Sequence, residues 1–375
     1  THTVGKDSIA TQGGIRLQLP DVWHAGPRNS ANRLQATEPK ADNYIHAYSS
    51  NPAVTLHTQV EAQHPEELIK HRKNSLDGRT ERYVFVVRVI LTKGTLNEGD
   101  SINVIYGDTT QGSRGYRAPA ISAKARPILL AIDSMGDSTF TRHSDLPTLT
   151  SLPGPAASLW LNAPSNATPN TPITLRAALI DAEDNPAFGP QLVTLRYPEG
   201  VTGPATILIP FAETGVDFTI TAKTPSIIRI QATWKGDSDI ITANPIEITK
   251  TLPKNQLYWG DLHSHTQYSW DGVGQDAFDY ARYTAKLDFY AMTDHAIPLS
   301  EGRTVGLNTH NWETYQAETD HYHAPKKFVT LHAYECSFGT PYGHHNVYFR
   351  AKAGALRDNK EVTLPELWNL LEAGN

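Results

Sequence analysis

The chain has 375 residues, with 33 lysine and arginine residues against 39 aspartate and glutamate residues, and a net charge of −6 at pH 7. This length predicts two or three domains, each long enough to bury its own core. The acidic balance argues against a nucleic acid partner, because no basic field is available for phosphates. No apolar run reaches about 18 residues, so no membrane span is predicted. The single cysteine, Cys336, excludes an internal disulfide framework.

The chain begins with threonine and carries no charged and then apolar leader. We interpret this start as a mature form after removal of a signal peptide, or as a trimmed chain. Many expected strands, frequent proline and glycine, and moderate charge favour an exported protein, secreted or periplasmic.

Residues 1–80 give few structural signals, and we predict an irregular N-terminal segment there. Residues 64–73 have the pattern of a short charged helix. His57, His64 and His71 recur every seven residues without accompanying carboxylates, which favours a solvated surface over a metal site.

Two β-rich regions follow. Residues 81–155 are predicted to form a β-sandwich-like domain, with strands at Tyr83–Leu91 and Ser101–Tyr106. Residues 156–252 are predicted to form an immunoglobulin-like β-sandwich, because short runs of apolar residues alternate with turn signals at regular spacing. In that domain, the acidic residues at 181, 183 and 184 could hold calcium, but a polar turn is the preferred interpretation.

In the last region, 253–375, apolar runs end or begin at residues that commonly bind metals. These residues are His263 and His265, Asp294 and His295, Glu335, and His344 and His345. Two residues that are two apart in a strand project from one face, so the first two imidazoles should lie side by side. A helix-like segment separates the first two runs, and this order is typical of a β/α barrel with its site at the strand ends.

Neutral imidazoles and carboxylates together suit Zn²⁺, Mn²⁺ or Fe²⁺. Taken alone, Thr293-Asp-His295 would be a turn and Glu335 an ion-pair partner, but their conjunction at successive strand ends favours a metal site. The predicted chemistry is metal-dependent hydrolysis, in which bound ions generate hydroxide and hold a developing oxyanion. Cys336 is expected to pack beneath the site.

These motifs resemble the PHP (polymerase and histidinol phosphatase) superfamily. The residues that carry the resemblance are His263-Ser-His265-Thr266 with Ser269 and Asp271, then Thr293-Asp-His295, Glu335 and Gly343-His344. A PHP-like family of unknown function is closer still, through Tyr258–Thr266, Leu287–Phe289 and His345–Phe349. Some of its members carry β-rich regions ahead of the metal domain.

The resemblance implies a distorted seven-stranded β/α barrel with two or three divalent metal ions (Zn, Mn or Fe). The implied metal ligands are His263 and His265 for one ion, Glu335 as a bridge, Asp271 and His295 for a second ion, and His344 for a third. Asp294 and His345 are the implied catalytic residues beside the metals, the first orienting ligands and the second facing the substrate.

The predicted fold is therefore a multidomain α+β chain, with β-sandwich-like N-terminal domains followed by the first half of a PHP-type distorted β/α barrel. The chain ends within the predicted helix 365–372, so we expect a missing part or a second polypeptide to complete the barrel. The predicted function is a phosphoesterase that acts on a small anionic phosphoester through metal-activated water.

Two main alternatives stay open. An amidohydrolase-type metal hydrolase also begins with His-x-His, although the sequence shows no metal-bridging lysine at the fourth strand. A secreted β-sandwich binding protein with a degenerate barrel is the alternative from a different class. A PHP domain associated with a nuclease or polymerase is disfavoured by the acidic charge.

Overall fold

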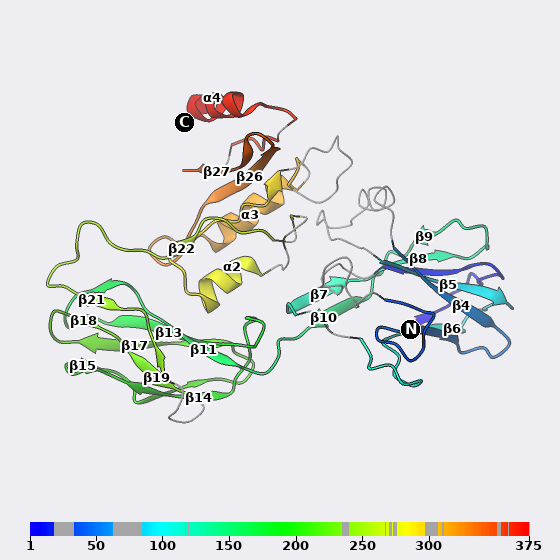
Figure 1. Ribbon diagram of the computed structural model, residues 1–375, viewed down its shortest axis with the longest axis horizontal. Coiled ribbons are helices and arrows are strands. Elements are labelled where there is room, and N and C mark those ends of the chain that lie inside the picture. The colour runs from blue at the N-terminus through cyan, green and yellow to red at the C-terminus, as the bar shows by residue number, and fades with distance from the viewer. Residues whose placement is uncertain are drawn as a thin grey trace. The chain divides into compact units, whose positions relative to one another are not determined.

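The computed structural model divides the chain into two compact units, Thr1–Ser151 and Leu152–Asn375 (Figure 1). It describes residues 1–18, 34–62, 85–116, 118, 120–234, 240–266, 268–269, 272, 276–296, 307–309, 311–350, 354–358 and 360–374. No helix among the described residues is long and apolar enough to cross a membrane.

The first unit is built from antiparallel strands. Its larger sheet has the order β4 (Thr55–Ala62), β5 (Phe85–Lys93), β2 (Gly14–Gln18), β8 (Leu129–Asp133) and β9 (Thr141–Arg142). A second sheet has the order β1 (His2–Thr3), β6 (Ser101–Tyr106) and β3 (Ile45–Ser49), and a ribbon pairs β10 (Thr148–Ser151) with β7 (Ala123–Pro127).

Side chains from both sheets of the first unit share one apolar core. Ile15, Val89 and Leu91 of the larger sheet and Ile45 and Ile102 of the smaller sheet are all almost fully buried. The unit is thus a β-sandwich.

Strands β1–β4 fall within residues 1–62, so the described part of the segment that the sequence predicts to be irregular contains ordered strands.

The second unit begins with a β-sandwich of two four-stranded sheets. One sheet has the order β11 (Ser158–Asn162), β13 (Ile173–Ile180), β17 (Gly215–Ala222) and β15 (Val201–Thr202). The other has the order β16 (Thr206–Ile209), β14 (Gln191–Arg196), β19 (Gln231–Thr233) and β20 (Ile241–Thr242). A small third sheet has the order β12 (Asn166–Ala167), β21 (Ile246–Ile248) and β18 (Ser226–Ile228).

The alternation of apolar and polar residues along its strands explains why this sandwich forms. In β14 and β17, buried and exposed residues alternate along the strand, as the period of two requires when one face meets a core and the other meets water. Leu175, Val193 and Ile220 are almost fully buried in the shared core.

The C-terminal region of the second unit, Gly260–Gly374, contains two small sheets. The first is parallel, with the order β22 (Gly260–Asp261), β23 (Phe289–Tyr290) and β25 (Val329–Thr330). The second has β24 (His295–Ala296) parallel to β26 (His332–Gly339), which then pairs antiparallel with β27 (Gly343–Phe349). The helices are α2 (Ala277–Asp279), the π-helical turn η2 (Tyr280–Thr284), α3 (Trp312–Tyr322) and α4 (Leu364–Gly374).

The predicted fold class, with its half β/α barrel, is wrong. The described chain consists mainly of strands in β-sandwiches. In the C-terminal region, two of the predicted barrel strands divide between the two sheets: Phe289–Ala296 contributes β23 and β24, and Val329–Gly339 contributes β25 and β26. The strand that contains His344, β27, is not a further parallel strand either. Only Thr340–Tyr342 separate β26 from β27, and the two strands pair antiparallel. A parallel return needs a crossover of about a dozen residues, and a short connection gives an antiparallel hairpin.

The sandwich of the second unit also supports the C-terminal region. The indole N–H of Trp259 donates to Ser165 Oγ at 2.9 Å, and the rings of Trp160 and Tyr280 meet edge to face with centroids 6.1 Å apart. Lys286 Nζ lies 3.5 Å from a carboxylate oxygen of Asp217 on β17. These contacts connect the start of the C-terminal region to the sandwich.

Candidate metal centre

Glu335, on β26, is the centre of a cluster of four histidines. One carboxylate oxygen, Oε2, lies 2.8 Å from His263 Nε2 and 3.0 Å from His265 Nε2. The other, Oε1, lies 3.0 Å from His295 Nδ1 and 2.5 Å from His344 Nδ1. Four imidazoles from three segments of the chain therefore meet at one carboxylate, which is only 2% exposed.

His263 and His265 come from an extended loop that follows β22, where the sequence predicts a continuous strand. Their rings nevertheless lie side by side, with centroids 5.2 Å apart, as their spacing predicts. The loop is fixed through Ser264, whose N–H donates to Thr293 Oγ1 at 3.1 Å and whose carbonyl accepts the N–H of Thr293 at 2.9 Å.

A glycine allows this loop to fold back on itself. A Cβ placed on Gly272 would lie 2.1 Å from the carbonyl oxygen of Thr266 and 2.7 Å from the carbonyl carbon of His265. No side chain fits at such distances, so the backbone after His265 requires glycine there. The close return of the chain places His265 against Glu335.

Asp294, one of the two predicted catalytic residues, lies behind the cluster rather than in it. Its carboxylate accepts the N–H of Thr266 at 2.7 Å and the hydroxyl of Thr266 at 2.9 Å. The residue is fully buried. Burial raises the pKa of the Asp294 carboxyl above its ordinary range, against the opposing effect of hydrogen bonds from Thr266 and Ser269. Asp294 thus anchors the loop that carries His265.

His345, the other predicted catalytic residue, points away from the cluster. Its Nε2 lies 2.9 Å from the carbonyl oxygen of Tyr342, and its ring lies edge to face with Phe338. The neighbouring His344 contacts Glu335. Successive side chains in a strand point to opposite faces, which explains why only one of this pair reaches the carboxylate.

Five of the six predicted metal ligands therefore come together. The sixth, Asp271, lies outside the described residues. Ser337 is a contact that the sequence analysis missed, with its Oγ 2.7 Å from His295 Nδ1. It lies two positions after Glu335 on β26, so its place on the same face of the strand was a usable signal. Cys336, between them, is fully buried, as predicted.

The pKa of Glu335 reflects two opposing effects. Burial alone would raise it, but hydrogen bonds from His265, His295 and His263 outweigh burial and hold the pKa of this carboxyl far below its ordinary range. Glu335 is consequently an anion over the whole physiological range, and it is available as a charged oxygen ligand.

The cluster contains two groups of donor atoms that could each hold a metal ion. One group is His263, His265 and Glu335, and the other is His295, Glu335 and His344, with the donor atoms of each group within 4.8 Å of one another. Zinc bound at about 2.0–2.2 Å in a tetrahedron has ligand atoms roughly 3.3–3.6 Å apart, so a small expansion of either group would admit an ion. The residues present therefore fit a divalent ion.

The cluster opens to solvent on one side. The side chains of His263 and His344 are 60% and 45% exposed, whereas those of His295 and Glu335 are 2% exposed. An ion held here would have protein donors on its inner side and solvent on its outer side.

No protein-family model and no curated protein matches the chain. Solved structures with some likeness include the D00-D0 domains of intimin, at 11% identity and a TM-score of 0.25 over 56% of this chain and 95% of that one. Another is the Escherichia coli adhesin FdeC, at 11% identity and a TM-score of 0.25 over 65% of each chain. Domains 4 and 5 of the S-layer protein SbsC match at 11% identity and a TM-score of 0.21, over 33% of this chain and 65% of that one.

The resemblance to the PHP superfamily is wrong, because no family model supports it. The predictions of a hydrolase, a phosphoesterase and an enzyme are likewise wrong. Of the alternatives, the β-sandwich binding protein agrees with the sandwich found in each unit. The solved structures have TM-scores too low to say what the chain binds.

Proposed function

We propose that this chain is a β-sandwich binding protein that holds divalent transition-metal ions through His263, His265, His295, Glu335 and His344. The observation that carries the proposal is the convergence of four imidazoles on one buried carboxylate. Imidazole nitrogen and carboxylate oxygen are the donors that Zn²⁺, Mn²⁺ and Fe²⁺ accept.

The arrangement supports up to two ions with Glu335 between them. Each of its two oxygens faces a different pair of histidines, so each oxygen belongs to a separate donor group. A surrounding contact also suits metal binding, because Asp294 anchors the loop that carries His265 through Thr266. Such outer contacts orient the rings of metal-binding histidines.

A bound ion would add a link between the loop after β22 and the sheet formed by β24, β26 and β27. The four histidines come from this loop, from β24 and from β27, and Glu335 comes from β26. Because β22, β23 and β25 are only two residues long, metal binding should contribute to the stability of the C-terminal region. The solvent side of the cluster leaves room for an anionic group of a small ligand to complete the coordination.

The test is elemental metal analysis of the whole chain after metal loading and dialysis, beside four variants. We expect bound Zn, Mn or Fe in the unmodified chain and its loss in His265→Ala and Glu335→Gln. His344→Ala and His345→Ala form a matched pair on one strand: the first should lower the metal content or affinity, and the second should leave both unchanged.

A stability measurement separates metal binding from a cluster held by hydrogen bonds alone. If the proposal is right, adding Zn²⁺ raises the melting temperature of the unmodified chain and of His345→Ala, but not of Glu335→Gln. A chain that binds no metal would show that the histidines serve only as hydrogen-bond partners of Glu335. A metal content unchanged in Glu335→Gln would overturn the assignment of Glu335 as a ligand.

A further inference from the structure

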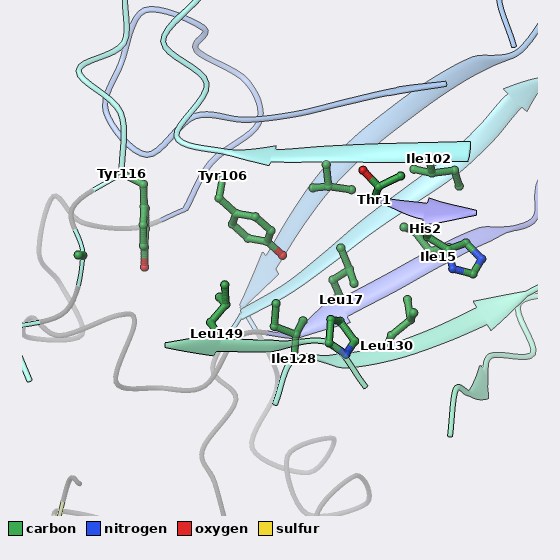
Figure 2. Close-up of a pocket in the computed structure, with 13 residues that line it drawn as sticks. Thr1, His2, Ile15, Leu17, Ile102, Tyr106, Tyr116, Ile128, Leu130 and Leu149 are labelled. Atoms are coloured by element: carbon green, nitrogen blue, oxygen red, sulfur yellow. The ribbon is translucent and has the colours of Figure 1, made fainter. Parts of the chain in front are cut away.

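The sandwich of the first unit contains a cavity of about 410 Å³ between its sheets. Figure 2 shows side chains from β2, β6, β8 and β10 around it, among them Leu17, Leu130 and Leu149. A volume of roughly 300–1,000 Å³ is usual for small-molecule sites, and well-packed interiors have few voids larger than a water molecule. This cavity is therefore larger than ordinary packing leaves.

The wall of the cavity is almost entirely uncharged. Most lining residues are aliphatic or aromatic, and no aspartate, glutamate, lysine or arginine side chain is among them. His2 is the one side chain there that titrates near neutral pH. Its pKa is lowered, chiefly by burial and also by the nearby His143 and the chain terminus, which favours the neutral imidazole. Apart from the α-ammonium group of Thr1, a lining residue, the wall offers an ion no opposite charge to offset the loss of its hydration.

One polar group in this wall lacks a partner. The hydroxyl of Tyr106 is buried and has no hydrogen-bond partner among the described residues. In Figure 2 it points toward the middle of the ring of apolar side chains. Burial, with a smaller contribution from Tyr116, raises the pKa of Tyr106 well above its ordinary range, so the hydroxyl keeps its proton and can donate.

A buried hydroxyl without a partner costs free energy, and native structures rarely leave one unsatisfied. A ligand oxygen at this point would accept its hydrogen bond. We propose that the first unit binds a small, uncharged, largely apolar molecule in this cavity, with one oxygen of the ligand bonded to the Tyr106 hydroxyl. This site is separate in sequence and in structural unit from the metal cluster, and neither proposal depends on the other.

The test uses 2-naphthol as the probe and naphthalene as its counterpart without the hydroxyl, titrated into the whole chain and followed by fluorescence. We expect one 2-naphthol per chain. Tyr106→Phe should weaken 2-naphthol binding about fivefold to tenfold, the usual effect of one hydrogen bond, and leave naphthalene binding unchanged. Tyr48→Phe is the matched control, because Tyr48 is an exposed tyrosine on β3 of the same sheet and should not change either affinity.

A second variant, Leu149→Trp, fills the cavity from β10 and should abolish binding of both compounds. Circular dichroism establishes that each variant remains folded, and Tyr106→Phe keeps the test decisive if Leu149→Trp does not fold. The proposal is overturned if 2-naphthol does not bind. It is equally overturned if 2-naphthol binds with the same affinity to Tyr106→Phe, because the hydroxyl then contributes nothing.

Discussion

The sandwich and the C-terminal region of the second unit are held together in different ways. In the sandwich, strands such as β13 and β17 run for eight residues and bury their alternate side chains in one apolar core. In the C-terminal region, the strands around the histidine cluster are often two residues long, and side-chain hydrogen bonds through Thr266, Thr293 and Asp294 complete the structure.

This difference indicates what each region is sensitive to. Burial of apolar surface is spread over many residues and has no preferred direction, so the sandwich should tolerate polar changes and suffer from lost volume. Hydrogen bonds to a single buried carboxylate are few and directional, so the C-terminal region should depend on individual polar groups.

The largest expected effect comes from truncating a side chain in the core of the second unit's sandwich. Leu175→Ala removes a fully buried side chain from β13, which lies between β11 and β17, and should destabilise the sandwich by about 3 kcal/mol. Hydrogen exchange of peptides from 158–248 measures this locally. Leu192→Ala is the control, because Leu192 is 57% exposed and its truncation should change stability by less than about 0.5 kcal/mol. Equal effects at the two positions would contradict the account of the core.

The sequence predicts these two regions unequally, for a physical reason. Alternation of apolar and polar residues recurs along strands such as β14 and β17, so these sandwich strands could be located from the pattern alone. In the C-terminal region, the apolar runs that end at Asp294-His295 and at Glu335 are each predicted to be a single barrel strand. Each divides between two sheets, because its path is decided by tertiary hydrogen bonds that no local pattern records.

The residues of the cluster were easier to predict than its topology. The side chains of His263 and His265 point to the same side of the extended chain because the residues are two apart. Glu335 and Ser337 lie on the same face of β26 for the same reason. The roles of Asp294 and His345 did not follow from the sequence, because they depend on which way each side chain points. That these histidines bind metal stays a prediction until the metal is measured.

The second prediction tests the dependence of the C-terminal region on one polar group. Asp294→Ala leaves the buried N–H and hydroxyl of Thr266 without their acceptor, and we expect local destabilisation of about 2 kcal/mol. Hydrogen exchange of peptides covering 260–266 should rise, with no change in peptides from the sandwich. Asp261→Ala is the comparison: this exposed residue accepts one N–H, from His263 at 2.9 Å, and should cost less than about 1 kcal/mol. A larger loss at Asp261 than at Asp294 would reverse the assignment.

The smallest expected effect concerns the carboxylate of Asp181 in the second unit's sandwich, and it depends on pH. Asp181 is buried, and it accepts the N–H groups of Gly154, Glu183 and Asn185 at 2.7–2.9 Å. Burial would raise the pKa of Asp181, but the hydrogen bonds from Asn185, Gly154 and Glu183 outweigh it and lower the pKa below its ordinary value of 3.8. These bonds form the polar turn that the sequence favours over a calcium site.

Because the folded-state pKa of Asp181 is the lower one, its ionised form stabilises the sandwich above the unfolded-state pKa, near 4. That contribution is lost as the pH falls through the folded-state value. Asp181→Asn should therefore destabilise the sandwich by about 1 kcal/mol at pH 7, and the difference from the unmodified chain should shrink between pH 4 and pH 2. Urea unfolding at pH 7 and at pH 2.5, followed by hydrogen exchange of peptides around 178–187, makes the comparison. A difference that grew as the pH fell would mean that protonated Asp181 is the stabilising form, and that the turn is held by the backbone rather than by the carboxylate.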